Sequence, residues 1–338
     1  MMSKKSKTRN SSIELLRILL MTMIVMHHVV SSVIALAFSS HSWACFDVFL
    51  HTAVVVFVLI SGYFGIRFSW KRLFSLVLQV IFYSILLFVV VGIIKGSWDG
   101  WFFAFLPFSN NYYWFVTVYL QLYLVSFFLN KLFDYCSERE FLMLLGVMAF
   151  FVFYLGFLRK NEICDDGKNL VNFIFLYQVG YGIRSFNTKF VVIKTPIFVS
   201  LIVMIAIIVL CFFIPDNHNL FIHSVVFLYK YNSPFLILLS VILLLVFLNI
   251  KMQSKMINYL ASSSFSIYLI HEHPLFREFA YVRPFHHMME SGIDGFTLLG
   301  FVLLFAITMS LACMLVDKFR VYLFSSIIKV YHKRPLKK

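Results

Sequence analysis

The chain has few charged residues and few residues that interrupt regular structure. Asp, Glu, Lys and Arg make up 13% of its 338 residues, and it contains only 13 Gly and 7 Pro. Hydrophobic residues make up 61%, including 42 Phe, and the mean hydropathy is +0.89. An ordinary soluble domain carries about 25% charged residues. The composition therefore excludes a soluble globular protein and predicts a membrane protein with several spans.

Cysteine and acidic residues are also scarce. The five cysteines are scattered and include no C-x-x-C pair, so the sequence predicts neither a zinc site nor a disulfide framework, and we expect no metal. Only 15 acidic residues stand against 29 basic ones, which gives a formal net charge of +14. The basic residues form short clusters between apolar runs rather than one basic face. This distribution argues against nucleic acid as a partner and instead indicates orientation in a membrane.

Apolar runs of about 20 residues, the length that crosses a bilayer, predict transmembrane helices. Ten such helices are expected, at 12–36, 45–66, 72–95, 112–130, 140–158, 170–186, 190–214, 234–250, 256–273 and 295–317. The expected fold is therefore all-α, a polytopic helix bundle that passes through the cell membrane many times.

The distribution of basic residues predicts that both termini are cytoplasmic. With the N-terminus inside, 21 of the 29 Lys and Arg residues fall in cytoplasmic segments and seven in external ones, as the positive-inside rule requires. We expect a basic cytoplasmic N-terminus at 1–11, a transmembrane domain at 12–317 and a basic cytoplasmic tail at 318–338. Within the tail, residues 319–331 suit a short interfacial helix.

The first apolar run contains ionisable residues, which are costly in a membrane and mark candidate functional sites. Arg17 and His28 are eleven positions apart, so a turn of about 100° per residue places them within roughly 20° of one helix face. Glu14 precedes Arg17 by three residues, at pairing distance. A buried neutral imidazole at His28 is a suitable proton acceptor. His27 points about 100° away and is expected to pack or to form a hydrogen bond.

Interpretations without chemistry remain open for the same residues. Arg17 can snorkel to the membrane surface, and His28 can hydrogen-bond a neighbouring helix. A third interpretation is a proton relay through Glu14, Arg17 and His28 in a carrier, because intramembrane ionisable residues also mark transport pathways.

A second run ends in Ser61-Gly62-Tyr63 and is followed by a basic cluster, Arg67, Lys71 and Arg72. Gly62 permits close approach of another helix. The three cations are candidate ligands for the phosphates of an anionic substrate, but anchoring of the helix at the cytoplasmic surface explains them equally well.

A late run carries Ser264, Tyr268 and His271 at positions i, i+4 and i+7, which places them on one polar stripe of an apolar helix. Such stripes more often join helices than perform chemistry, so we interpret these residues as supporting ones around a site. Trp114 begins an earlier apolar run, where an interfacial aromatic belt explains it. The external connection at 272–294 is the best place for a polar acceptor to dock.

Together these motifs resemble the acyltransferase-3 family of integral membrane acyltransferases. The resemblance rests on Glu14–Arg17 followed by His28, and on the weaker matches at Ser61–Tyr63, Trp114 and Ser264–His271. It extends from residue 12 to about residue 317. In that family the histidine of the first motif is taken as the catalytic base and its arginine as essential, which implies these roles for His28 and Arg17, with Glu14 as the partner of the arginine.

The resemblance implies a membrane O-acyltransferase, in particular an O-acetyltransferase, that modifies polysaccharide of the cell envelope. The donor would be a cytoplasmic acyl-CoA such as acetyl-CoA, and the acceptor a hydroxyl of a cell-surface or lipid-linked glycan. Arg67, Lys71 and Arg72 would bind the CoA phosphates, although their spacing is looser than the arginine pair that the family often shows. Membrane lipid is the other expected partner. The rival class is a proton-coupled transporter or glycan exporter.

Overall fold

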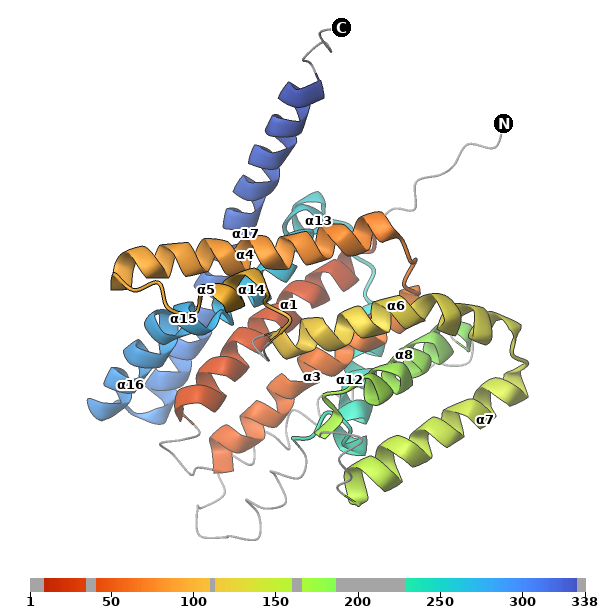
Figure 1. Ribbon diagram of the computed structural model, residues 1–338. Helices are drawn as coiled ribbons and strands as arrows, with labels where there is room; N and C mark the ends of the chain where they lie inside the picture. The colour runs from red at the N-terminus through yellow and green to blue at the C-terminus, as the bar shows by residue number, and fades with distance from the viewer. Residues whose placement is uncertain (1–8, 35–40, 110–112, 160–165, 187–228, 333–338) are drawn as a thin grey trace, which may run out of the picture.

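The computed structural model describes residues 9–34, 41–109, 113–159, 166–186 and 229–332. In these ranges the chain forms helices joined by short connections and no strand, so the all-α prediction is confirmed for them (Figure 1). The α-helices are α1 (Ser11–Val29), α3 (His41–Phe64), α4 (Trp70–Lys95), α5 (Trp101–Phe105), α6 (Trp114–Tyr135), α7 (Glu138–Ala149), α8 (Leu170–Ser185), α12 (Pro234–Asn249), α13 (Lys255–Ala261), α14 (Phe265–His271), α15 (Pro274–Arg277), α16 (Arg283–Glu290) and α17 (Gly295–His332). Three π-helical segments continue or join them: η1 (Val30–Ile34), η3 (Phe150–Leu158) and η5 (Glu278–Val282).

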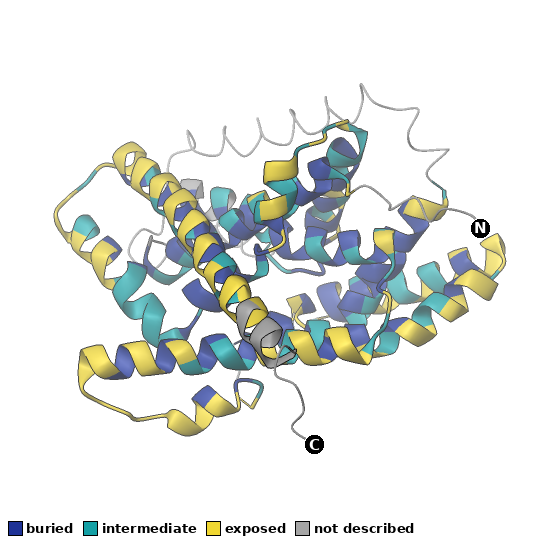
Figure 2. Ribbon diagram, turned by 90° about the horizontal axis from the view of Figure 1, so that it is seen from above, coloured by how far each residue is buried: buried dark blue, intermediate teal, exposed yellow. Residues whose placement is uncertain are grey.

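Several of these helices have the length and the apolar composition of membrane-spanning helices. Among the residues that the structure describes, six helical segments are long and apolar enough to cross a membrane: Ser11–Val33, Phe46–Phe64, Trp70–Lys95, Trp114–Tyr135, Glu138–Leu158 and Gly295–Ser325. Large apolar side chains such as Ile93, Phe128 and Leu304 are 60–70% exposed on the outside of the bundle. Figure 2 shows exposed residues along much of α17, whereas the helices at the centre are largely buried. A surface of this kind is suited to lipid rather than water.

The remaining predicted spans correspond less directly to the structure. Helices α8 and α12 lie within the predicted spans 170–186 and 234–250 and contain 16 residues each, which is short for a membrane span. The predicted span 190–214 lies outside the described residues.

Two predicted elements differ from the structure. The span expected at 256–273 is divided into α13 and α14 by a turn at Ser262–Ser264. Three consecutive serines favour such a break, because their hydroxyls compete for backbone hydrogen bonds. The prediction that a helix ends at 317 and a separate interfacial helix follows is wrong, since α17 runs unbroken for 38 residues from Gly295 to His332. No Gly or Pro stands between 318 and 332 to end it.

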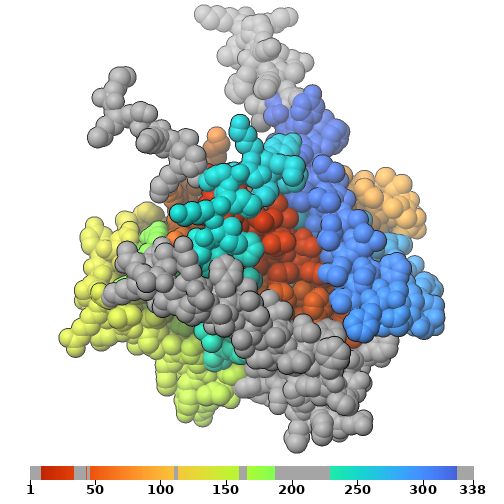
Figure 3. All heavy atoms as spheres, turned by 180° about the vertical axis from the view of Figure 1, so that it is seen from behind, coloured from red at the N-terminus to blue at the C-terminus, as the bar shows by residue number. Residues whose placement is uncertain are grey.

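Helix α1 lies at the centre of the bundle and contacts α3, α13, α14 and α17. Figure 3 shows it in red between the teal α12–α13 region and the blue α17. Three hydrogen bonds hold its first turn, one to a neighbouring residue and two to residues far away in the sequence. Asn10 Oδ1 accepts from the Ser12 amide (3.1 Å), Ser12 Oγ donates to the Ile250 carbonyl (2.6 Å), and Ser11 Oγ accepts from the Ser254 amide (2.8 Å). These bonds set the position of every candidate residue farther along α1.

Helix α3 approaches α8 most closely at two glycines. A Cβ atom added to Gly62 would collide with the Tyr177 carbonyl of α8, and one added to Gly180 would collide with the Leu59 carbonyl of α3. The close helix approach predicted at Gly62 is therefore confirmed. This contact holds α3 beside α1, where the two helices share the site described next.

Candidate active site

One side of α1 borders two cavities in succession. The first, which we call the arginine cavity, has a volume of about 400 Å³, and α1 contributes Glu14, Arg17 and Met21 to it. The second, the histidine cavity, has a volume of about 280 Å³, and η1 and the end of α1 contribute Ile24, His27, His28 and Ser31. Phe115 of α6 lines both cavities. Arg17 and His28 therefore share one side of the helix, as the spacing predicted, but lie about 16 Å apart along its axis.

His28 is held by the segment that ends α14. Its Nδ1 lies 2.8 Å from His271 Nε2 and 2.8 Å from Glu272 Oε2. Glu272 also lies 3.6 Å from Arg277 Nη1 through its other carboxylate oxygen. The His28 side chain is 14% exposed and that of Glu272 is 13% exposed. The imidazole thus has a carboxylate beside it in a largely water-excluded site, where charge interactions are strong.

The hydrogen bonds of this group indicate which nitrogen of His28 carries a proton. His271 Nδ1 contacts the Ile267 carbonyl, which can only accept, so this nitrogen donates. In neutral His271 the other nitrogen, Nε2, is then an acceptor, and His28 Nδ1 must be its donor. Neutral His28 consequently has its lone pair on Nε2. That is the tautomer in which an imidazole acts as a base, with its orientation fixed by the groups at Nδ1.

A second imidazole and carboxylate pair lies next to the first. His27 Nδ1 is 2.7 Å from Asp47 Oδ1, and the ring centroids of His27 and His28 are 5.1 Å apart. His51, one turn after Asp47 in α3, donates from Nδ1 to the Asp47 carbonyl (2.8 Å), and its ring centroid is 4.2 Å from that of His27. The expected hydrogen bond of His27 is present. His27 nonetheless lines the same cavity as His28, because a cavity between α1 and α3 is wide enough to contact both of two adjacent residues.

The arginine cavity has a different character. Arg17 Nη1 lies 3.0 Å from Glu14 Oε1, so the pairing that the spacing predicted is present. Ser61 lines this cavity and shares a 3.1 Å hydrogen bond with the Tyr119 hydroxyl, and Ser264 lines it from the turn before α14. This part of the site combines one neutralised guanidinium with hydroxyl groups.

The structure therefore brings most of the sequence candidates to the two cavities. His28, Trp114 and Tyr268 line the histidine cavity, with His271 behind His28. The basic cluster after α3 is placed elsewhere. Arg67, Lys71 and Arg72 are exposed and line neither cavity, and Lys71 instead borders an aromatic groove between the start of α4 and α6.

Sequence reasoning did not identify Asp47, His51 or Glu272 as site residues. Asp47 and His51 stand four residues apart in an apolar helix, and ionisable residues in such a segment are themselves a signal of function. Glu272 was placed in an external connection, where a carboxylate needs no partner. Its contact with His28 joins residues 244 positions apart and could not be read from local spacing.

Both groups of titratable residues contain atoms that metals bind. The potential ligand atoms of His27, Asp47 and His51 lie within 4.8 Å of one another, and so do those of His28, His271 and Glu272. Histidine nitrogens and a carboxylate are a donor set for zinc and related ions. The Nδ1 atoms of His51 and His271 are already directed at backbone carbonyls, however, which leaves only Nε2 of these two residues as a possible ligand.

Comparison with known proteins is consistent with this geometry. No curated protein and no solved structure matches the chain. A protein-family model described as an acyltransferase domain, that of the acyltransferase 3 family, matches residues 10–317, a range that contains Arg17, His28 and Glu272. With nearly the whole chain matched, the protein belongs to the acyltransferase 3 family and is an integral membrane acyltransferase.

Proposed function

We propose that the protein transfers an acyl group, in particular acetyl, from acyl-CoA to a hydroxyl of a cell-surface or lipid-linked glycan. The observation that carries this proposal is His28, whose Nδ1 is engaged by His271 and Glu272 beside a cavity of about 280 Å³. An imidazole held in this way is a general base for a hydroxyl group, which must lose a proton to attack a thioester.

The reaction follows from that arrangement. His28 Nε2 takes the proton of the acceptor hydroxyl as its oxygen attacks the thioester carbonyl. A C–O bond forms, the C–S bond breaks through a tetrahedral intermediate, and the imidazolium returns the proton to the departing thiolate. Glu272 stabilises the transient imidazolium, and His271 keeps the ring in position. No other reactant is consumed.

Each cavity binds one of the two substrates, so the substrates approach each other from opposite ends of α1. The acceptor occupies the histidine cavity, which has polar and aromatic walls from His51, Trp114 and Tyr231 that suit a saccharide. The donor occupies the arginine cavity, and its thioester reaches His28 past Phe115, the residue common to both. Arg17 acts on the donor rather than on the reacting carbonyl, because about 16 Å of helix separates it from His28.

This proposal is tested by its product. Deleting the gene should remove one ester from the glycans of the cell, detected as an acyl signal that mild alkali removes from the wild-type material. Purified protein supplied with acetyl-CoA and the glycan from the deletion strain should restore that ester. Unchanged glycan esters in the deletion strain, together with no transfer by the purified protein, would contradict the proposed acceptor class.

The positive-inside asymmetry of the Lys and Arg residues supports a cytoplasmic position for the arginine cavity, on the side where acyl-CoA is made, and this orientation can be measured. In a cysteine-free background, Ser291→Cys in the connection before α17 should react with a membrane-impermeant thiol reagent in intact cells. Tyr135→Cys, which replaces a side chain 88% exposed at the end of α6, should react only after the cells are opened. The reverse pattern would place the donor cavity outside.

Tyr268 is expected to donate a hydrogen bond to the oxygen of the tetrahedral intermediate. It lines the histidine cavity, and its buried hydroxyl does not donate a hydrogen bond to any residue that the structure describes. Tyr268→Phe should lower kcat by about 10²-fold with little change in KM, the effect typical of losing one donor to an oxyanion. Tyr113→Phe is the matched control, because the Tyr113 hydroxyl donates to the Leu269 carbonyl (3.0 Å) and is not available to substrate. A normal kcat for Tyr268→Phe would show that the Tyr268 hydroxyl does not stabilise the tetrahedral intermediate.

A further inference from the structure

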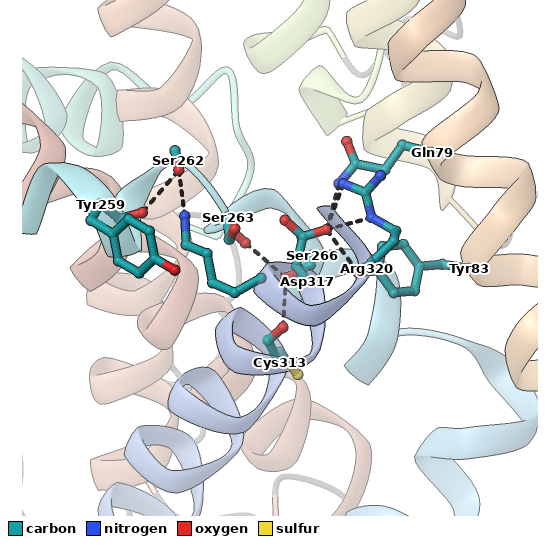
Figure 4. A network of polar contacts seen from close by, with 10 residues as sticks. Gln79, Tyr83, Tyr259, Ser262, Ser263, Ser266, Cys313, Asp317 and Arg320 are labelled. Carbon is teal, nitrogen blue, oxygen red and sulfur yellow. Dashed lines mark hydrogen bonds and ion pairs between the residues drawn. The ribbon is translucent and has the colours of Figure 1, made fainter. Parts of the chain in front are cut away.

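Two cations that the sequence analysis related only to membrane orientation contact α13 or the turn after it, at the rim of the arginine cavity. Arg9 lines the cavity, and its Nη1 donates to the Asn258 carbonyl at 3.3 Å. Lys318 of α17 donates from Nζ to Ser262 Oγ at 2.6 Å, and its ammonium lies 3.9 Å from the centre of the Tyr259 ring. Ser262 is itself a lining residue of the cavity, and Figure 4 shows its hydroxyl contacts. Both cations are thus held at one edge of one cavity.

The acidic residues near these two cations are paired with other groups. Asp317, the residue before Lys318, forms a salt bridge with Arg320 (2.7 Å) and accepts a hydrogen bond from the Tyr83 hydroxyl (2.8 Å), as Figure 4 shows. Glu14, the acidic residue of the cavity, pairs with Arg17. Within the described part of the chain, neither Arg9 nor Lys318 forms a salt bridge. Two like charges held at one rim repel each other, and an anion placed there relieves that repulsion.

The cavity behind this rim has a mixed lining. Met21, Ile60 and Phe265 are apolar parts of its wall, Ser61 contributes a hydroxyl group, and Phe115 also lines the histidine cavity. The rim therefore suits a group with several negative charges, and the interior suits a long uncharged arm. The CoA thioester that the proposed reaction requires has both parts. Its phosphates are at one end, and its acyl group is at the end of an uncharged chain.

We propose that Arg9 and Lys318 bind the phosphate groups of the acyl donor at the rim of the arginine cavity, and that they rather than Arg67, Lys71 and Arg72 determine its affinity. The inference rests on the proposed function, because it requires a CoA thioester as donor. Lysine and arginine form charge-assisted hydrogen bonds to phosphate, which are stronger than bonds between neutral groups. Anchoring at a membrane surface accounts for basic residues on one side of the bilayer. It does not account for two that are fixed at a cavity edge without acidic partners.

The test compares three sets of substitutions in the full-length protein, purified in detergent. Arg9→Gln combined with Lys318→Gln removes the proposed ligands. Lys131→Gln combined with Arg139→Gln removes the same two residue types from exposed positions that line neither cavity. Arg67, Lys71 and Arg72 changed together to Gln represent the competing ligand set. For each, the Kd for CoA is measured by calorimetry, and KM is measured with acetyl-CoA and with S-acetylpantetheine, which lacks the nucleotide phosphates.

Arg9→Gln/Lys318→Gln should weaken CoA binding and raise KM for acetyl-CoA at least about tenfold, the cost of losing a charge-assisted hydrogen bond. KM for S-acetylpantetheine should not change, and neither should any constant of the Lys131→Gln/Arg139→Gln control. Equal CoA affinity in wild type and Arg9→Gln/Lys318→Gln would overturn the inference while leaving the proposed function intact. A loss confined to the Arg67, Lys71 and Arg72 variant would also overturn it. Failure of the wild type to bind CoA at all would instead remove the proposed donor, and the inference with it.

Discussion

Changing Gly62 to alanine is expected to prevent the protein from folding stably. The new Cβ atom would collide with the Tyr177 carbonyl of α8, and a backbone atom cannot rotate out of the way as a side chain can. Helices α3 and α8 would have to separate along their whole contact, which loosens α3 against α1. Overpacking of a close-packed interior costs about 1–3 kcal/mol, and this backbone collision belongs at or above the upper end. The expected result is little or no monodisperse protein in fluorescence-detected size-exclusion chromatography.

A second glycine provides the control for this experiment. Gly146 lies within α7, and an added Cβ atom would meet nothing within 4 Å. Gly146→Ala should therefore keep or slightly raise thermal stability, since alanine is favoured over glycine inside a helix by about 0.5–1 kcal/mol. Normal yield and melting temperature for Gly62→Ala would show that α3 and α8 do not approach as closely as the structure has them.

The parts of this fold that depend on local sequence were predictable. Long apolar runs predicted helices near the observed Trp70–Lys95, Trp114–Tyr135 and Glu138–Leu158, because length and hydropathy are set by the bilayer. The pairing of Glu14 with Arg17 followed from helical periodicity alone. Residues on one rigid helix keep their relative positions whatever surrounds them, so their arrangement can be predicted without knowing the neighbouring helices.

The arrangement of different helices was not predictable in this way. The contacts of His28 with Glu272 and of His27 with Asp47 depend on which helices are neighbours, and apolar faces that all resemble one another do not specify that. The same reason explains why the sequence did not indicate which basic residues lie together at the arginine cavity. Sequence proximity to a family motif favoured Arg67 as a phosphate ligand, whereas the proposed ligands Arg9 and Lys318 come to one edge of the arginine cavity from the two ends of the chain.

His28→Ala is expected to lower ester formation by about 10²- to 10⁴-fold, the usual effect of removing a positioned general base. Binding of CoA should persist, because the arginine cavity is unchanged and Glu272 keeps Arg277 as a partner (3.6 Å). The measurement is kcat for acetyl transfer by purified protein, alongside the Kd for CoA. Normal transfer by His28→Ala would remove His28 from the mechanism, and absence of transfer by the wild type with acetyl-CoA and acceptor would remove the proposed reaction.

Two other histidines distinguish loss of chemistry from loss of structure in that experiment. His287, whose side chain is 84% exposed on α16, should tolerate alanine without a change in kcat or melting temperature. His27→Ala removes the imidazole 2.7 Å from buried Asp47 and leaves His51 Nδ1 at 3.8 Å, and breaking a buried pair costs about 3–5 kcal/mol. It should therefore lower the melting temperature more than His28→Ala does, while the folded fraction retains more activity than the His28 variant. The opposite ranking, with His27→Ala the less active and His28→Ala the less stable, would assign the base to the His27–Asp47 pair.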